Sequence, residues 1–88
     1  MDYTKIYPTL DLHGEYSFSV KYLTKEFIND NIFLKNKTIC IMHGIGDGIV
    51  KKCTHDYLKK DKRVKSYKVD IFNPGCTIVE LKEDLWEN

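Results

Sequence analysis

The sequence has few cysteines and no long hydrophobic run. Cys40, Cys53 and Cys76 are an odd number, lie far apart and form no C-x-x-C pair, so we predict neither a disulfide scaffold nor a thiolate zinc site. We expect three free, partly buried thiols in the reducing cytoplasm. The longest apolar run, Ile39 to Met42, is far shorter than the roughly 18 residues of a membrane span. The first residues also lack the basic start and apolar stretch of a secretory signal, so we expect a cytoplasmic protein without a membrane partner.

The chain also lacks an excess of charge of either sign. Its 88 residues carry 14 basic and 13 acidic side chains, a net charge of +1, which excludes binding to polyanions by bulk electropositivity. However, residues 49–68 carry eight basic and two acidic side chains, a net of +6, between segments of net −1 and −4. Because salt screens charges beyond about 8 Å, this segment can attract a polyanion by itself. A solvated lysine-rich helix face explains the same pattern.

The length and hydrophobic content fit one small folded domain. Hydrophobic residues make up 42% of the 88 positions, enough for a single packed core near the lower size limit. No linker or low-complexity segment interrupts the chain. We therefore predict a single domain over residues 1–88, with its core at about 8–82 and a charged tail at 83–88.

Hydrophobic spacing predicts the element order β-α-β-α-β-β. The expected elements are a short strand before Gly14, a helix over about 17–31, a strand over 38–42, a helix from Ile49 to about 60, a strand with Tyr67, Val69 and Ile71, and a last strand with Thr77, Val79 and Leu81. The near-continuous apolar run at 38–42 is typical of a strand that is central or buried on both faces. Because a helix joins the first two strands, they should be parallel.

Both of these strands end in the same His-Gly pair, at residues 13–14 and 43–44. Ligands of open α/β sheets bind outside the carboxyl ends of parallel strands, so neighbouring strands would bring two imidazoles and the Asp11 carboxylate to one edge. Asp11 and His13 share a strand face, where the carboxylate can orient the imidazole or share a metal with it. Ordinary strand-end hydrogen bonds explain the pair equally well. His43 has a similar alternative, as a buried and hydrogen-bonded imidazole.

A glycine-rich turn precedes the second helix, with Gly44, Gly46 and Gly48. Exposed backbone N–H groups and the helix dipole would favour a bound phosphate there. The spacing departs from the G-x-G-x-x-G fingerprint and lacks the Lys of a Walker loop, so a tight strand-to-helix turn is the alternative. Asp47 is expected to cap the helix by accepting from the amide of Ile49 or Val50, which places a negative charge beside that pocket.

Other chemistry-bearing residues give weaker signals. His55 lies among lysines in the middle of the second predicted helix, so we expect it at the surface. The six tyrosines are scattered along the chain and predict no base-stacking platform. A serine hydrolase is unsupported, because the sequence has no G-x-S-x-G motif.

Three motifs together resemble the Smr (small MutS-related) domain family. They are L-D-L-H-G at 10–14, H-G-x-G at 43–46 before a helix, and G-C-T-I-V-E-L at 75–81. They lie in the family's order and at its spacing, and the resemblance covers about residues 8–82. It implies a two-layer α/β fold with a four-stranded mixed sheet and two main helices. It also implies nucleic-acid binding together with nicking of DNA or cleavage of RNA.

The resemblance assigns roles to the residues of these motifs. It places Asp11 and His13 on a motif linked to cleavage. His43, Gly44 and Gly46 fall on a motif linked to cleavage and nucleic-acid contact. The sequence departs from the family next to the glycines: Ile45 stands where Lys is common, Asp47 where Thr is common, and Lys51 where Arg is common.

Our leading hypothesis is a nucleic-acid-binding domain that cleaves the DNA or RNA backbone. The predicted catalytic residues are Asp11, His13 and His43, and the predicted nucleic-acid contacts are Gly44, Gly46, Gly48, Lys51, Lys52 and Lys59. If a divalent cation takes part, Mg²⁺ or Mn²⁺ held by Asp11 and His13 is the form we expect. The alternative is a binding module for branched DNA or structured RNA without catalysis, which Ile45 and Asp47 favour. A protein-interaction domain that ignores nucleic acid is a third hypothesis.

Overall fold

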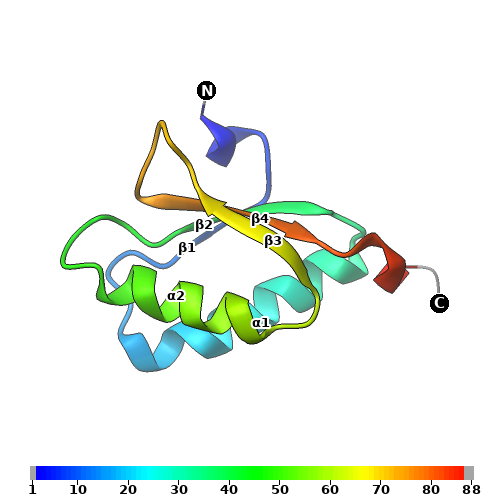
Figure 1. The fold of residues 1–88 in the computed structure, drawn as a ribbon, viewed down its shortest axis with the longest axis horizontal. Helices are drawn as coiled ribbons and strands as arrows, with labels where there is room; N and C mark the ends of the chain where they lie inside the picture. The colour runs from blue at the N-terminus through cyan, green and yellow to red at the C-terminus, as the bar shows by residue number, and fades with distance from the viewer. Residues whose placement is uncertain (1, 87–88) are drawn as a thin grey trace.

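Apolar side chains at three- and four-residue intervals build two helices. The computed structural model describes the backbone of residues 2–86 and the side chains of residues 2–84. Helix α1 (Ser17–Phe33) buries Val20 and Ile28, and helix α2 (Ile49–Lys60) buries Leu58. Both helices lie on the same side of a sheet, so that the molecule has two layers (Figure 1). These buried residues meet apolar side chains of the sheet in one core.

Four strands form the sheet. They are β1 (Thr9–Asp11), β2 (Thr38–Met42), β3 (Val64–Val69) and β4 (Cys76–Leu81), and the short 3-10 turns η1 (Tyr3–Lys5) and η2 (Glu83–Trp86) lie near the ends of the chain. The strand order is β1-β2-β4-β3, with β1 and β2 parallel and the other two pairs antiparallel. This confirms the predicted mixed four-stranded sheet and the parallel pairing of the first two strands.

Strand β2 lies inside the sheet and is covered on both faces. Ile39 and Ile41 belong to the core below it, and Cys40 is also fully buried. The cover over Cys40 comes from η1, since the Cys40 thiol donates to the Tyr3 carbonyl at 3.6 Å. Figure 1 shows η1 on the side of the sheet opposite the helices. Strand β1, by contrast, is an edge strand, and Asp11 at its end is exposed.

The third strand differs from the prediction. It runs from Val64 to Val69 and does not include Ile71, which is 86% exposed. The strand ends because the Asp70 carboxylate accepts from the Phe72 amide at 3.0 Å and starts the turn to β4. A register shift between Val64 and Ser66 then lets Val64 and Tyr67 both pack on the core, which a strict alternation does not predict.

Helix α1 extends two residues beyond the predicted end. The Asn31 side-chain Nδ2 donates to the Phe27 carbonyl at 2.8 Å, and the Asn31 Oδ1 accepts from the Asn36 Nδ2 at 3.0 Å. These bonds satisfy a buried polar side chain that would otherwise favour an earlier helix end.

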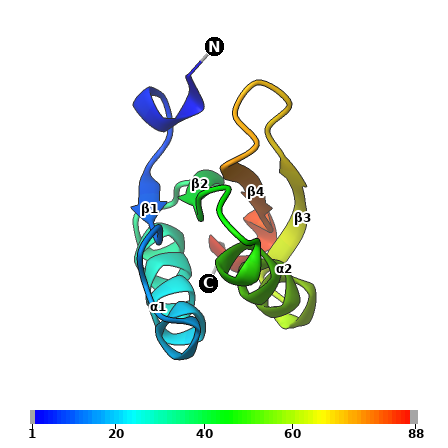
Figure 2. The ribbon, with the colours of Figure 1, turned by 90° about the vertical axis from the view of Figure 1, so that its left-hand side faces the viewer.

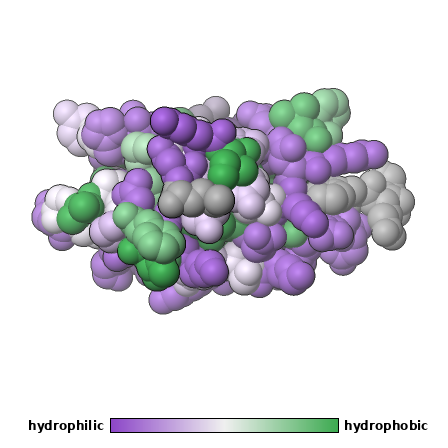
Figure 3. Space-filling model, turned by 90° about the horizontal axis from the view of Figure 1, so that it is seen from above, coloured by the Kyte–Doolittle hydropathy of each residue, from purple (hydrophilic) through white to green (hydrophobic). Residues whose placement is uncertain are grey.

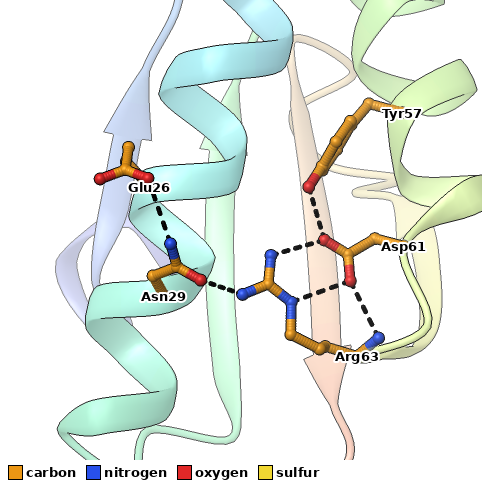
Figure 4. Close-up of polar contacts among 5 residues, drawn as sticks. All are labelled: Glu26, Asn29, Tyr57, Asp61 and Arg63. Atoms are coloured by element: carbon orange, nitrogen blue, oxygen red, sulfur yellow. Dashed lines mark hydrogen bonds and ion pairs between the residues drawn. The ribbon is translucent and has the colours of Figure 1, made fainter.

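A polar network joins the two helices at the start of β3 (Figure 4). Asp61 accepts from the Arg63 guanidinium at 2.8 and 3.0 Å and from the Tyr57 hydroxyl at 2.6 Å, and Arg63 also donates to Asn29 of α1. Burial alone would raise the pKa of Asp61, but the hydrogen bonds from Arg63 and Tyr57 outweigh it and lower that pKa to about 2. The Arg63 guanidinium therefore holds the fold together, and its charge is matched by Asp61 instead of being free for a polyanion.

The face of the sheet opposite the helices is mostly hydrophilic. Figure 3 views this face, where hydrophobic groups stand in separate small clusters rather than in one continuous patch. The three cysteines are free, as the sequence predicted. Among residues 2–86, no helix combines the length and the apolar character that crossing a membrane requires.

Candidate nucleic-acid interface and active site

The turns that follow β1 and β2 lie side by side and border a cleft. Figure 2 shows both turns at the same end of the molecule, together with the start of α2. The cleft has a volume of about 610 Å³, and its lining includes His13, His43, the glycine turn at 44–48 and Lys51. The two His-Gly pairs therefore share one edge of the sheet, as their place after neighbouring parallel strands predicted.

Asp11 and His13 form an exposed pair at this edge. The Asp11 Oδ1 lies 2.5 Å from the His13 Nδ1 and also accepts from the His13 amide at 3.1 Å. Their side chains are 53% and 68% exposed. The hydrogen bond with Asp11 raises the pKa of His13, and the same bond lowers the pKa of Asp11. Since Nδ1 is held by the carboxylate, the imidazole directs Nε2 away from Asp11.

His43 has the opposite surroundings. It is 4% exposed, its Nδ1 lies 2.9 Å from the Gly44 carbonyl oxygen, and its Nε2 lies 2.7 Å from the Thr77 hydroxyl. A carbonyl only accepts, so Nδ1 carries the proton and Nε2 of the neutral ring accepts from Thr77. The Thr77 oxygen then accepts from the His55 Nε2 at 2.8 Å. Burial lowers the pKa of His43 and of His55, which favours this neutral arrangement.

The glycine turn requires glycine for two different reasons. Gly44 and Gly48 have φ values of +84° and +83°, where other residues are strained. At Gly44, a Cβ atom would also lie 3.3 Å from the His13 Cβ, so the second turn packs directly against the first. Asp47 accepts from the Ile49 amide at 3.1 Å, which confirms the predicted capping bond, although Gly48 occupies the N-cap position itself.

A known protein family matches the part of the chain that contains both turns. The model of the Smr domain family matches residues 10–82. The chain belongs to the Smr domain family. It is 33% identical over 76 residues to the endonuclease MutS2 of Clostridium tetani, and 34% identical over 77 residues to that of Clostridium kluyveri. These alignments cover 83% and 84% of the chain but only 10% of each relative, so the chain spans about a tenth of their length.

Two solved structures share the fold of this Smr domain. The Smr domain of Thermus thermophilus MutS2 superimposes with a TM-score of 0.82 at 24% identity, covering 85% of this chain and 98% of that one. YdaL, a stand-alone small MutS-related protein from Escherichia coli, gives a TM-score of 0.79 at 19% identity, covering 84% of this chain and 63% of that one. The predicted family and the predicted fold are both confirmed.

His55 and Thr77 form a hydrogen-bonded chain with the buried His43, which sequence reasoning did not find. The prediction that His55 lies at the surface is wrong, because it is half-buried. Its ring packs edge-on against His43 at 5.7 Å and lies tilted against Tyr67 at 5.1 Å. The signal was its place between buried Thr54 and Leu58 on the helix. The lysines near His55 in the sequence made this signal hard to see, because they occupy neighbouring positions on the helix.

The three predicted lysine contacts differ in their position relative to the cleft. Lys51 lines the cleft. Lys52 is exposed and donates to Asp56 at 3.1 Å, one turn along α2. Lys59 is exposed near the other end of α2, on the helix face shared by Lys51 and His55. Only Lys51 is therefore placed to contact a ligand inside the cleft.

The predicted metal ligands of this Smr domain, Asp11 and His13, lie beside each other. Among the side chains that the structure describes, no group of three or more His, Cys, Asp or Glu residues is arranged to hold a metal ion. Asp11 offers an exposed carboxylate, and the Nδ1 of His13 is directed at that carboxylate. One carboxylate fits Mg²⁺ or Mn²⁺ where substrate phosphates and water supply the other ligands.

Proposed function

We propose that this Smr domain binds a nucleic-acid backbone in the cleft and cleaves a phosphodiester bond there, with His13 as the proton-transfer group. The observation that carries the proposal is the exposed Asp11–His13 pair, in contact with a glycine turn that opens a helix. The relatives named endonuclease MutS2 support it, although the chain matches only a tenth of their length.

The phosphate would bind at the start of α2. The backbone amides in the first turn of a helix have no intrahelical partner, and the helix dipole places partial positive charge there. Gly44, Gly46 and Gly48 leave this backbone open to a ligand, and Lys51 lines the same cleft. The Asp47 carboxylate, bonded to the Ile49 amide, occupies one of these donors and reduces the net positive charge.

His13 would then move the proton. In the neutral ring Nδ1–H donates to Asp11, so Nε2 accepts a proton from the attacking oxygen as the new O–P bond forms. The leaving oxygen takes up a proton from solvent water as its P–O bond breaks. The Asp11 carboxylate stabilises the imidazolium, which is why it raises the pKa of His13. Asp11 also fixes the ring orientation through its bond with Nδ1, and it accepts a second hydrogen bond from the His13 backbone amide.

A divalent cation is compatible with this arrangement. Asp11 would be its protein ligand, with phosphate oxygens and water completing the shell. When bound, Mg²⁺ or Mn²⁺ would neutralise charge on the reacting phosphate. Cleavage measured with added Mg²⁺, with Mn²⁺ and with EDTA tests this requirement.

His43 is better suited to a positioning role than to proton transfer. Both of its ring nitrogens are engaged, and its Nδ1–H holds the Gly44 carbonyl. The Gly44 and His43 amides both donate to the Gly75 carbonyl, at 3.0 and 2.9 Å. The predicted catalytic role of His43 stays a prediction, and we propose that it fixes the shape of the glycine turn.

A binding module without cleavage is the second candidate function. Two observations favour it: the Asp47 carboxylate lies at the anion site, and Ile45 is 68% exposed in the same turn. An apolar residue and an acidic one at this place lower the positive charge available to stabilise a reacting phosphate. Such a module would recognise branched DNA or structured RNA by its backbone.

The experiment combines binding and cleavage in one preparation. Binding to duplex DNA, branched DNA and structured RNA is measured from about 50 to 200 mM salt, where several phosphate contacts should weaken affinity steeply. Nicking of a supercoiled plasmid and cleavage of the RNA are measured for the wild type and for His13→Ala. Salt-sensitive binding with cleavage lost in His13→Ala supports the enzyme. Equal residual cleavage leaves the binding module, and no binding at low salt refutes both.

A further inference from the structure

Two exposed aromatic rings stack on each other beside the cleft. Tyr16 and Phe18 have ring centroids 5.4 Å apart and planes within 5° of parallel. Their exposed fractions are 72% and 80%, so the pair contributes little to the core. Tyr16 also lines the cleft that contains His13 and Lys51. The sequence predicted no aromatic cluster, but the turn before α1 brings the rings of residues 16 and 18 together.

A second stacked pair shows what a structural role looks like in this chain. Tyr3 and Tyr7 also stack, with centroids 5.8 Å apart, but both are half-buried. They belong to the segment that covers β2, where the Tyr3 carbonyl accepts from Cys40. Tyr16 and Phe18 lie instead at the start of α1, with their outer ring faces open to solvent.

We propose that Tyr16 and Phe18 form a stacking platform for an unpaired base of a nucleic acid whose backbone lies in the cleft. This inference rests on the proposed function and adds its substrate class: single-stranded or locally unpaired nucleic acid. Aromatic side chains bind bases of any sequence through their π faces, and each base so stacked strengthens binding. A base inside a duplex has both faces covered by its neighbours and cannot use the platform.

The neighbouring charges match this ligand. Lys51 and the glycine turn present positive charge and backbone amides in the cleft that Tyr16 borders. A nucleotide offers its phosphate and its base on two sides of a sugar, so one strand can reach both features. An apolar protein partner would gain from the rings but would leave the Lys51 charge unmatched, and it is disfavoured for that reason.

The test compares single strands with a duplex on the full chain. Fluorescence anisotropy measures binding to labelled oligo(dT), oligo(rU) and a duplex of equal length, and the two single strands distinguish DNA from RNA. The double variant Tyr16→Ala, Phe18→Ala should lose roughly fivefold to hundredfold in affinity for a single strand while duplex binding is unchanged. Phe18→Trp should keep single-strand binding, because it preserves the stack.

Phe33→Ala is the matched control, since Phe33 is 84% exposed at the other end of α1. Circular dichroism of each variant verifies the fold. Equal losses for single strand and duplex, or no loss for either, would overturn the platform and leave the proposed function standing. If the wild type binds none of the three probes at low salt, the platform and the proposed function both fail.

Discussion

The two His-Gly turns have the same residues in sequence and opposite environments in the structure. The side chain of His13 is 68% exposed and is paired with a carboxylate, whereas His43 is 4% exposed and bonds two neutral groups. The cause is the position of each strand: β1 is at the edge of the sheet and β2 is inside it. Equal motifs thus acquire different chemistry from the topology alone.

This contrast gives the two imidazoles different chemical properties. The exposed imidazole can exchange a proton with a ligand, and its pKa is raised by Asp11. The buried imidazole is kept neutral, since burial lowers its pKa, and it holds the glycine turn through the Gly44 carbonyl. Each of the following substitutions or conditions perturbs one side of the comparison.

The largest effect is expected from removing the buried ring. His43→Ala should destabilise the fold by about 2–4 kcal/mol, because it leaves a cavity and removes the hydrogen bonds that the ring makes with the Gly44 carbonyl and the Thr77 hydroxyl. Urea unfolding measures the loss, and His13→Ala is the control that should leave the unfolding midpoint unchanged. Similar unfolding midpoints for the two variants would show that His43 does not stabilise the fold more than His13 does.

Asp11→Asn weakens the exposed pair without removing its hydrogen-bonding shape. The amide oxygen still accepts from Nδ1–H, but the negative charge is lost, so the pKa of His13 should fall toward its ordinary value. We expect cleavage to slow by about tenfold to hundredfold, as for other groups that orient a histidine. The pH dependence of the cleavage rate is the measurement. An unchanged rate and profile would contradict the assigned role of Asp11.

Alanine at the two glycines compares the turns directly. Gly14 and Gly44 have φ values of +81° and +84°, so alanine is strained at both positions. A Cβ at Gly14 meets no atom within 4 Å, whereas one at Gly44 approaches the His13 Cβ to 3.3 Å. We expect losses in unfolding free energy of about 1 kcal/mol for Gly14→Ala and about 2 kcal/mol for Gly44→Ala. Equal losses would argue against contact between the turns.

Acid should weaken the fold through protonation of His43 and its neighbour His55. His43 and His55 have lowered pKa values in the folded state. As the pH falls below about 6.5, the unfolded chain therefore binds more protons than the folded chain, and the free energy of unfolding decreases. His13 has a raised pKa, so its contribution is complete at low pH and is lost as pH rises through that pKa. Urea unfolding between about pH 7.5 and 5.5 should show this decline. His55→Gln should reduce it and His13→Gln should not; a decline unaffected by His55→Gln would refute the cause.

Much of the fold followed from the sequence, because hydrophobic periodicity and the order of elements along the chain are local properties. Both helices and the shared edge of Asp11, His13 and His43 were predictable from hydrophobic spacing and parallel pairing. The mixed four-stranded sheet was an implication of the family resemblance. The end of β3 was not, since a register shift near Ser66 and the Asp70 turn are set by pairing with β4.

The site was less predictable than the fold. His55 reaches Thr77 only because α2 packs under the sheet, and that contact joins residues 22 positions apart. The stacking of Tyr16 on Phe18 depends on the extended backbone of Tyr16 just before the helix, which composition does not reveal. Three-dimensional packing therefore supplied both the contact of His55 with Thr77 and the proposed base platform.

The most direct test of this division is a titration of the three imidazoles, followed by NMR through their ring protons. We expect His13 to titrate above the ordinary histidine pKa of about 6.5, and His43 and His55 to titrate below it. We also expect Asp11→Asn to shift the pKa of His13 alone. A titration in which His43 has the highest pKa, or in which all three rings titrate together, would contradict the division between the two turns.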